Sequence, residues 1–492
     1  MKKMKKELKK EIVILVPYPA QGHVTPMQNL ARAFLAQGFY PLIVLPHSFH
    51  RKIHGEKEEE EEDGLKWVGL GDGMGQEEGS PDFFAIESAM EKMMPSELEG
   101  LIEKVRGEGG EVACVVVDLL ASWAIESAHK RGIPVAGFWP AMLASYLFIA
   151  SIPLMLNRRL LSHTGVRGLS DARVLIMTRK ALTGLPQREG KFSLHPELPV
   201  ISTEDLPWLV GTEAARKGRF RFWKRTLERS SALKWLLVNS FPDESKLEAA
   251  NRKLSSEGCP RVLPIGPICR NGITKGVSFW EEDMSCLKWV AKQKRNSVIY
   301  ISFGSWVSPI GEAKLRNLAV ALEGSGRPFI WVLRSSWRQG LPNGFLERVE
   351  KEDRGRVVSW APQKQILQHE SVACYITHCG WNSILEALQF QKKLLCYPVA
   401  GDQFVNCAFV VEVWKVGLKL NGVEANDVEE GIVRVVEDKE MEERLRILNQ
   451  RIMAGNNNTG ASMFKTFLED LKRASSTTTT TQDASEINIP CY

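Results

Sequence analysis

The sequence lacks the features that mark several classes of protein. No stretch approaches the ~20 consecutive apolar residues of a membrane-spanning helix. The nine cysteines form no CxxC pair and no dense framework, which in a chain of 492 residues favours reduced cytoplasmic thiols over a secreted disulfide scaffold. No GxGxxG motif follows an early strand, so the sequence disfavours a nicotinamide-dependent oxidoreductase.

The sequence also carries little net charge outside its first ten residues. The formal charge of +5 arises from 64 basic and 59 acidic residues, and residues 1–10 contain six lysines and one glutamate. The rest of the chain therefore has 58 basic and 58 acidic residues, and this balance argues against nucleic-acid binding. Because Pro17 ends the next apolar run after about five residues, we expect a buried strand behind a basic arm and not a signal peptide.

Short apolar runs alternate with helical patterns along most of the chain. We expect a strand at 12–16, a turn at 17–22 and a helix with apolar positions from Met27 to Leu35, with Pro26 in its first turn. This alternation predicts parallel sheets with crossover helices, the doubly wound α/β class. Further strands are expected at 42–45, 65–70, 114–117, 297–302, 329–333, 373–377 and 394–397.

The length and the two series of strands predict two large domains. We expect an N-terminal domain at 1–262, a linker at 263–281, a C-terminal domain at 282–474 and a disordered tail at 475–492. The last helix of the second domain can pack back on the first. The acidic run at 56–63 should form an exposed loop. Ligands of open α/β sheets bind beyond the carboxyl ends of the strands, so we expect the chemistry in those loops.

The most informative segment begins at Trp360 and ends at Gln403. Within it, a strand leads into the turn HCGWNS, which opens a helix. Asn382 and Ser383 can cap this helix, and the free N–H groups of a helix N-terminus are a natural phosphate site. The Trp360 indole can stack on a base, and Asp402 and Gln403 can hydrogen-bond a polyol.

This segment closely resembles the signature box of the plant UDP-sugar-dependent family 1 glycosyltransferases. WAPQ, HCGWNS, Glu386 and the closing DQ fall in register with that box. Further stretches that resemble landmarks of the family are Gly22-His23, Ile265-Gly266-Pro267 and Phe303-Gly304-Ser305. The resemblance implies a GT-B fold, in which two Rossmann-like domains face a cleft. The acceptor would bind in the first domain and the UDP-sugar in the second.

The resemblance also implies a role for each residue of the donor site. Trp360 and Ala361 would contact the uracil, and Gln363 and Glu386 would bind the ribose. The diphosphate would be bound by Ser305, His378, Asn382 and Ser383, and the sugar would face Trp381, Asp402 and Gln403. Glutamine at the position of Gln403 is associated in this family with glucose donors, and Trp381 fits glucose better than glucuronate. The implied reaction inverts the anomeric carbon and needs no metal.

Two residues are the candidates for catalysis. His23 lies at the first strand-to-helix turn, and an imidazole pKa of about 6.5 suits a base that deprotonates an acceptor hydroxyl. Asp118 follows the strand expected at 114–117 and emerges at the same sheet edge. An aspartate at the matching position partners the histidine in the family, and a carboxylate orients such a base. Without the resemblance, either residue is more simply interpreted as a helix cap.

Two departures from the family pattern stand out. Residues 391–393 are Gln-Lys-Lys where the box usually has Gly-Val-Pro, which changes the turn into the next strand. Pro140 stands where many relatives carry a hydroxyl that reaches the O6 of the sugar, which leaves part of the glucose assignment open.

Two other interpretations fit the sequence less well than a transferase. A catalytically inactive sugar-nucleotide-binding protein would be expected to lack His23 or residues of the box, and all of them are present. A zinc site is disfavoured because the spacing of its candidates does not match a finger. Those candidates are His369, Cys374, His378 and Cys379.

The expected partners are small molecules. We expect UDP-glucose and a lipophilic acceptor with a hydroxyl or carboxyl group, such as a plant specialised metabolite or hormone. We expect a cytoplasmic monomer with no nucleic acid and no membrane span. The acceptor pocket is expected near Phe138, Trp139 and 194–208, which look apolar and aromatic.

Overall fold

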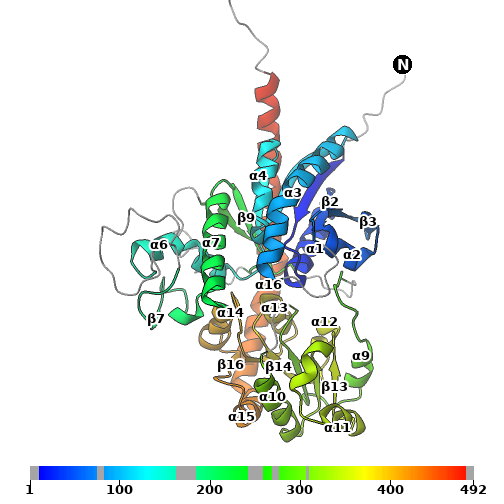
Figure 1. The fold of residues 1–492 in the computed structure, drawn as a ribbon, viewed down its shortest axis with the longest axis vertical. Coiled ribbons are helices and arrows are strands. Elements are labelled where there is room, and N and C mark those ends of the chain that lie inside the picture. The colour runs from blue at the N-terminus through cyan, green and yellow to red at the C-terminus, as the bar shows by residue number, and fades with distance from the viewer. Residues whose placement is uncertain are drawn as a thin grey trace, which may run out of the picture.

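The chain forms two α/β domains that share one long C-terminal helix (Figure 1). The computed structural model describes residues 10–74, 82–161, 184–241, 259–268, 276–305 and 310–483, apart from the side chains of 454–458 and 475–483. Each domain is built round a sheet of mostly parallel strands with helices packed on it. The expected doubly wound class is therefore confirmed.

The first sheet belongs to the N-terminal domain. Its strands lie in the order β10 (Arg261–Pro264), β9 (Trp235–Val238), β6 (Val135–Trp139), β5 (Glu111–Asp118), β1 (Glu11–Val16), β2 (Tyr40–Pro46), β4 (Leu65–Leu70) and β3 (Glu59–Glu62). All neighbours are parallel except β3 and β4. Ile14 and Leu15 of β1 enter different hydrophobic clusters, so both faces of the sheet are covered. This double burial explains why β1 reads as a continuous apolar run.

The second sheet is entirely parallel. Its order is β13 (Gly355–Val358), β12 (Phe329–Val332), β11 (Val298–Ser302), β14 (Val372–Thr377), β15 (Lys393–Cys396) and β16 (Gly417–Lys419). Counted from β11, this is the 3-2-1-4-5-6 order of a Rossmann domain. The strands expected from apolar runs in both halves of the sequence are thus confirmed, with ends that differ by one to a few residues.

The helices cover the sheets and frame the space between the domains (Figure 1). The N-terminal domain contains α1 (Gln21–Leu35), α2 (His47–His54), α3 (Phe83–Gly107), α4 (Trp123–Lys130), α5 (Leu143–Ala150), α6 (Ile152–Asn157) and α7 (Glu213–Ser230). The second domain contains α9 (Ser285–Val290), α10 (Glu312–Gly324), α11 (Phe345–Lys351), α12 (Gln363–Gln368), α13 (Trp381–Gln389), α14 (Gln403–Ala408), α15 (Ala425–Glu437) and α16 (Lys439–Asp483). Within the described residues, no helix combines the length and the apolar character needed to cross a bilayer.

Helix α16 ties the two domains together. In the second domain, Nδ2 of Asn449 donates to the carbonyl of Leu388 in α13 at 2.9 Å. Farther along, the ring of Phe464 packs edge-on against Phe34 of α1 with centroids 5.1 Å apart, and Phe467 meets Trp235 of β9 at 5.5 Å. The final helix of the second domain therefore packs on the first sheet (Figure 1).

Two local expectations differ from the structure. Helix α1 begins at Gln21, so Pro26 lies inside the helix and not in its first turn. The acidic run contains an edge strand, β3, and Glu59 of that strand pairs with Lys66 and Lys104 at 2.7 and 2.8 Å. Charged side chains are a common way to keep an edge strand from pairing with another chain.

The ends of the domains also differ from the expected boundaries. The first sheet continues to Pro264, past the expected limit at 262. Helix α16 continues to Asp483, so the beginning of the segment expected to be disordered is helical. Residues 484–492 of that segment lie outside the described residues.

Candidate functional site

The candidate residues lie where the strand order of each sheet reverses. In the first sheet the order reverses between β1 and β5, and in the second between β11 and β14. Loops that leave such neighbouring strands in opposite directions open a crevice at the carboxyl edge of the sheet. His23 follows β1 and Asp118 ends β5, while Ser305 follows β11 and His378 follows β14.

His23 and Asp118 form a hydrogen-bonded pair, as the sequence predicted. Nδ1 of His23 lies 2.7 Å from Oδ2 of Asp118, whose side chain is fully buried. Oδ1 of Asp118 accepts a hydrogen bond from the backbone N–H of Leu120 at 2.9 Å. The same carboxylate therefore caps a short helix and orients the imidazole. With Nδ1–H donating to Asp118, Nε2 of His23 is the nitrogen that can accept a proton.

Opposing effects set the pKa of His23. Burial lowers it, because desolvation disfavours the imidazolium, but the charge of Asp118 and its hydrogen bond outweigh burial and raise the pKa above the ordinary value of 6.5. Asp402 of the second domain adds to the rise from across the cleft. His23 is therefore a stronger base than a free imidazole. Its neutral form becomes the major one only at a pH above 6.5.

The start of α13 offers free backbone N–H groups, which favour an anion. Gly380 precedes the helix without a side-chain cap, so the first N–H groups, at residues 381–383, have no partner within the helix. The His378 imidazole lies beside them, between Gly304 and Gly380. A Cβ on either glycine would come within 2.5 Å of its Nε2. Burial lowers the pKa of His378 to about 4, so this imidazole is neutral near pH 7.

The two residues predicted to hold the ribose contact each other. Nε2 of Gln363 donates to Oε2 of Glu386 at 2.8 Å, and burial raises the pKa of Glu386. Oε1 of Gln363 accepts from the hydroxyls of Tyr300 and Tyr375 at 3.2 and 2.9 Å. The Tyr375 hydroxyl also lies 3.1 Å from Oγ of Ser383. These bonds lock the Gln363 amide, which leaves Glu386 as the acceptor at the surface of the network.

The indole predicted to stack on uracil already has an aromatic neighbour. The rings of Trp280 and Trp360 lie 4.7 Å apart at an angle of 39°, and the Arg334 guanidinium lies 4.4 Å above the Trp280 ring. Arg334 also donates to the carbonyl of Ser305. Trp280 therefore covers one side of Trp360, and a base would use the other. Ala361 beside it is buried, and its carbonyl accepts from the N–H of Gln363 at 2.8 Å.

The last two residues of the box lie at the start of α14. Oε1 of Gln403 accepts from the N–H groups of Val399 and Ala400, both at 2.9 Å. Two donors at one atom require that atom to be the oxygen, so the Nε2 group of Gln403 is the half that can donate to a ligand. Oδ2 of Asp402 accepts from Nδ2 of Asn406 at 2.7 Å, and burial raises the pKa of Asp402.

Known proteins are similar in sequence to this chain along almost its whole length. The family model "UDP-glucoronosyl and UDP-glucosyl transferase" matches residues 275–451. UDP-glycosyltransferase 82A1 of Arabidopsis thaliana is 47% identical over 94% of this chain and 99% of its own length. The chain belongs to the plant family 1 UDP-glycosyltransferases. The predicted family and enzyme class are thus confirmed.

Solved structures share the fold of this UDP-glycosyltransferase. Os79 from O. sativa, in complex with UDP, has a TM-score of 0.75 and 25% identity over 93% of this chain and all of its own. Phytolacca americana UGT2, in complex with UDP-2fluoro-glucose and pterostilbene, has a TM-score of 0.73 and 21% identity over 95% and 100%. The expected GT-B fold is confirmed. The roles of the individual site residues stay predictions.

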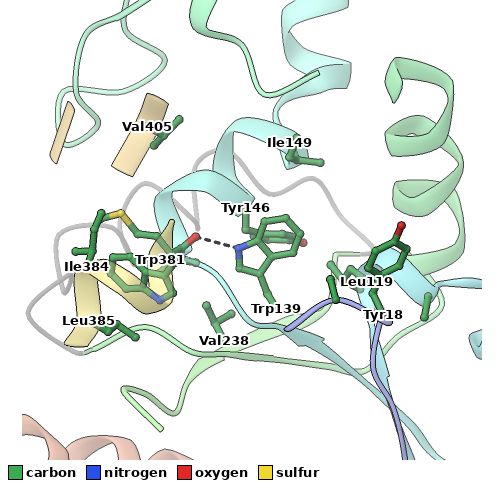
Figure 2. Packing of buried hydrophobic residues seen from close by; sticks show 14 of the residues in the cluster. Tyr18, Leu119, Trp139, Tyr146, Ile149, Val238, Trp381, Ile384, Leu385 and Val405 are labelled. Atoms are coloured by element: carbon green, nitrogen blue, oxygen red, sulfur yellow. Dashed lines mark hydrogen bonds between the residues drawn. The ribbon is translucent and has the colours of Figure 1, made fainter. Parts of the chain in front are cut away.

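Trp381 of this UDP-glycosyltransferase does not point its indole at an open sugar site. The indole stacks on Phe241 at 6.1 Å, and its Nε1 donates to the carbonyl of Asn239 at 2.7 Å. Figure 2 shows Trp381 and Ile384 of α13 beside Val238 and Trp139 of the N-terminal domain, in one continuous apolar cluster. The side chain thus packs between the domains, and its indole N–H already has a partner in the N-terminal domain. Only the backbone of residue 381 lies on the anion site.

Asn382, in the first turn of α13, contacts the first turn of α1, which carries His23. Its Nδ2 donates to the carbonyl of Gly22 at 2.9 Å. In a regular helix this carbonyl would accept from the N–H of residue 26, but Pro26 has none. The proline that the sequence placed in the wrong turn therefore frees an acceptor for the opposite domain.

The family departure at 391–393 has a structural explanation. Gln391 adopts φ of 54°, a left-handed conformation that suits the usual glycine. Nζ of Lys392 donates to the carbonyls of His369 and Val372 at 2.9 and 3.0 Å, and burial lowers the pKa of Lys392 to about 8. Nζ of Lys393 donates to the carbonyl of Val436 at 2.6 Å, in the last turn of α15. None of these partners is a predicted donor-binding residue.

The acceptor side is less well located by the sequence. Phe138 is fully buried in the sheet core, so it does not line a pocket as expected. Trp139 is also buried, and its Nε1 donates to the carbonyl of Met142 at 3.0 Å (Figure 2). The aromatic group that lies next to His23 is Tyr18, with ring centroids 5.6 Å apart, followed by Phe83, 5.9 Å from Tyr18.

Several residues that shape the site were missed from the sequence. They are Trp280 beside Trp360, Tyr300 and Tyr375 behind Gln363, Asn239 below Trp381, and Asn406 beside Asp402. Of these, only Asn406 carried a local signal, because it lies four positions after Asp402 and shares a helix face with it. Tyr375 lies on a strand within the same segment, and Trp280, Tyr300 and Asn239 come from distant segments that the fold brings in.

Proposed function

We propose that this UDP-glycosyltransferase moves glucose from UDP-glucose to a hydroxyl or carboxyl group of a small lipophilic acceptor, with inversion. The observation that carries the proposal is the His23–Asp118 pair, 2.7 Å apart at the edge of one sheet. The bond from Asn382 to Gly22 holds this pair next to the uncapped start of α13 on the other sheet.

In the proposed reaction, Nε2 of His23 takes the proton of the acceptor hydroxyl. The oxygen attacks the anomeric carbon from the face opposite UDP, the bond to the diphosphate breaks, and inversion results. A positioned base of this kind contributes about 10²–10⁴-fold to the rate. The buried carboxylate of Asp118 stabilises the imidazolium that forms.

The charge of the leaving diphosphate can be stabilised by the protein without a metal ion. The N–H groups of residues 381–383 point out of the N-terminus of α13, where the helix dipole favours anions. The neutral His378 imidazole lies beside them, packed against Gly304 and Gly380. We therefore propose that catalysis needs no metal ion, so that EDTA leaves the rate at saturating UDP-glucose unchanged.

The donor sugar is assigned from Gln403. Its Nε2 group is the one that can donate to the sugar, while its oxygen holds the loop at 399–400. Glutamine here is associated with glucose donors in the family. Asp402 lies close enough to His23 to raise its pKa, which supports a sugar position between the two.

The acceptor class is assigned from the surroundings of His23. Tyr18 and Phe83 offer aromatic faces near the base, and α7 supplies Phe222, 5.0 Å from Phe83. Tyr18 and Phe222 are buried, so Phe83 is the partly exposed ring of the three, and its aromatic face suits a flat, lipophilic molecule with one exposed hydroxyl or carboxyl group. We propose that the enzyme works as a cytoplasmic monomer.

The test uses purified full-length protein with UDP-glucose or UDP-galactose and a panel of phenolic, terpenoid and hormone acceptors. Mass spectrometry should detect glucosides, NMR should show the β-anomer, and gel filtration should report a monomer. The control is His23→Ala, which should form no product. Transfer of galactose in preference to glucose would contradict the donor assignment, and the absence of product with every acceptor would contradict the transfer reaction.

A further inference from the structure

Three buried cysteines converge below the donor loop. Cys379 lies in the turn between β14 and α13, Cys396 ends β15, and Cys407 lies in α14. The three Sγ atoms lie within 4.8 Å of one another, and the residues are at most 2% exposed. No disulfide joins them. Among the described residues, this is the one cluster of three potential metal ligands.

The backbone at Cys379 gives a second, independent observation. Its φ is 66°, a left-handed conformation that costs most residues other than glycine on the order of 1 kcal/mol. The turn is held by two bonds, from the N–H of Cys379 to Oγ1 of Thr377 at 3.2 Å and from Nδ2 of Asn406 to the Cys379 carbonyl at 3.1 Å. A strained residue held in this way places its thiol against the other two.

The distances suit a thiophilic ion. A Zn–S bond of about 2.3 Å puts the sulfurs of a tetrahedral site about 3.8 Å apart, so these three would close by at most about 1 Å. We propose that Cys379, Cys396 and Cys407 form a three-thiolate site for a divalent thiophilic cation such as Zn²⁺ or Cd²⁺. Binding replaces three S–H protons by three S–metal bonds and releases the protons to solvent. The fourth position is left to water.

The charge around the cluster selects a divalent ion. Three thiolates with a divalent ion leave a charge of −1, and the ammonium of Lys419 in β16 acts electrostatically on both Cys396 and Cys407. A monovalent ion such as Cu⁺ would leave −2 in a buried site, which one lysine does not balance. Lys419→Gln should therefore weaken binding severalfold without removing a ligand.

The site would act on the donor half of the enzyme. Cys379 follows His378 directly, and Asn406 bonds both the Cys379 carbonyl and Oδ2 of Asp402, at 3.1 and 2.7 Å. A shift of the sulfurs on binding is thus transmitted to the diphosphate loop. We expect an occupied site to change the KM for the UDP-sugar severalfold and to leave the KM for the acceptor unchanged.

The experiment is a titration of reduced, untagged protein with Zn²⁺ and Cd²⁺ under anaerobic conditions. Wild type should bind one ion per chain, release three protons, and show a thiolate-to-metal charge-transfer band with Cd²⁺. Cys396→Ala and Cys407→Ala should lose more than about 100-fold in affinity, because changes to groups behind the ligands alone cost 10–100-fold. Cys374→Ala and Cys114→Ala, which remove buried thiols outside the cluster, should bind as wild type does.

A measurement on the unmutated protein guards against variants that fail to fold. The ¹¹³Cd NMR shift of the bound ion reports how many sulfurs coordinate it, and three are expected. The proposal is overturned by a wild type that binds no ion at micromolar concentration, by a shift typical of oxygen and nitrogen ligands, or by equal affinity in the cluster variants. Equal changes in both KM values would contradict the placement of the ion below the donor loop.

Discussion

The two halves of the cleft use different physics for their tasks. On the N-terminal side, one buried carboxylate and one imidazole form a charge-assisted pair, and Asp118 controls the pKa of His23. On the C-terminal side, the proposed donor site is a network of amides, hydroxyls and backbone N–H groups, and its histidine is neutral near pH 7. A base needs a tunable charge, whereas a site for a diphosphate ligand needs dipoles, because the ligand supplies the charge.

The largest expected effect comes from removing the base. His23→Ala should lower kcat by about 10²–10⁴-fold. The affinity for UDP, measured by calorimetry, should stay nearly unchanged, because the proposed donor contacts lie on the opposite domain. A loss of UDP affinity in this variant would contradict the division of labour between the two halves.

Asp118→Asn breaks the charge of the pair but keeps its shape. The amide oxygen can still cap Leu120, so folding should be preserved, while kcat should fall by about 100-fold, the lower end of what a positioned base contributes. In wild type, kcat/KM should rise with pH through the His23 pKa, which lies above 6.5. Without the Asp118 charge, burial lowers that pKa, so the rise should move to lower pH. A pH profile that does not move would show that Asp118 acts only as a cap.

Gln403→His tests the donor half. The ratio of kcat/KM for UDP-glucose to that for UDP-galactose should fall by about tenfold, the effect of one hydrogen bond to a sugar hydroxyl. Gln403→Glu is the control, because it keeps an acceptor for the N–H groups of Val399 and Ala400 and removes the Nε2 donor. It should therefore lower the same ratio, through loss of the hydrogen bond to the sugar and not through a shift of the loop at 399–400. An unchanged ratio in Gln403→His would show that another residue selects the sugar.

Pro26→Ala tests the link between the halves. The new N–H would donate to the carbonyl of Gly22 and compete with Asn382. Loss of about 1 kcal/mol of contact should lower kcat about fivefold and leave UDP affinity unchanged. Pro95→Ala makes the same change inside α3 and should leave kcat as it is. An unaffected kcat in Pro26→Ala would mean that the contact does not position His23.

The smallest effect concerns stability alone. Gln391→Gly should raise the free energy of unfolding by about 0.5–1 kcal/mol, because glycine adopts φ of 54° without strain. Urea unfolding measures this change. Glu430→Gly, on the exposed face of α15, should lower stability by about 1 kcal/mol instead. A destabilised Gln391→Gly would show that the bond from Gln391 to Asn449 outweighs the strain.

Local patterns predicted what local physics controls. The apolar runs at β1, β5, β11 and β14 became buried strands, because a strand covered on both faces must be apolar throughout. The placement of His23 and Asp118 at one sheet edge also followed from the sequence, since Asp118 ends one strand and His23 lies in the first turn of the helix that follows the neighbouring strand. The family resemblance then supplied the enzyme class.

The failures share a cause. Pro26 was placed in a first turn because nothing local shows that α1 begins at Gln21. The glutamates of β3 read as a loop because lysines from β4 and α3 are needed to pair them. Trp381 was assigned to the sugar, although its indole is held by Asn239 and Phe241 from the other domain.

The sequence by itself determined the class of fold and the enzyme family, and it singled out His23 as the candidate base. These properties depend on hydrophobic periodicity, on residue types next to strand ends and on one contiguous signature box, and all three are local features of the sequence. Only the tertiary structure decided which distant groups meet: Asn382 with Gly22, Trp280 with Trp360, and the thiols of Cys379, Cys396 and Cys407. Such contacts arise because the two domains pack against each other, and the spacing of these residues along the chain does not predict them.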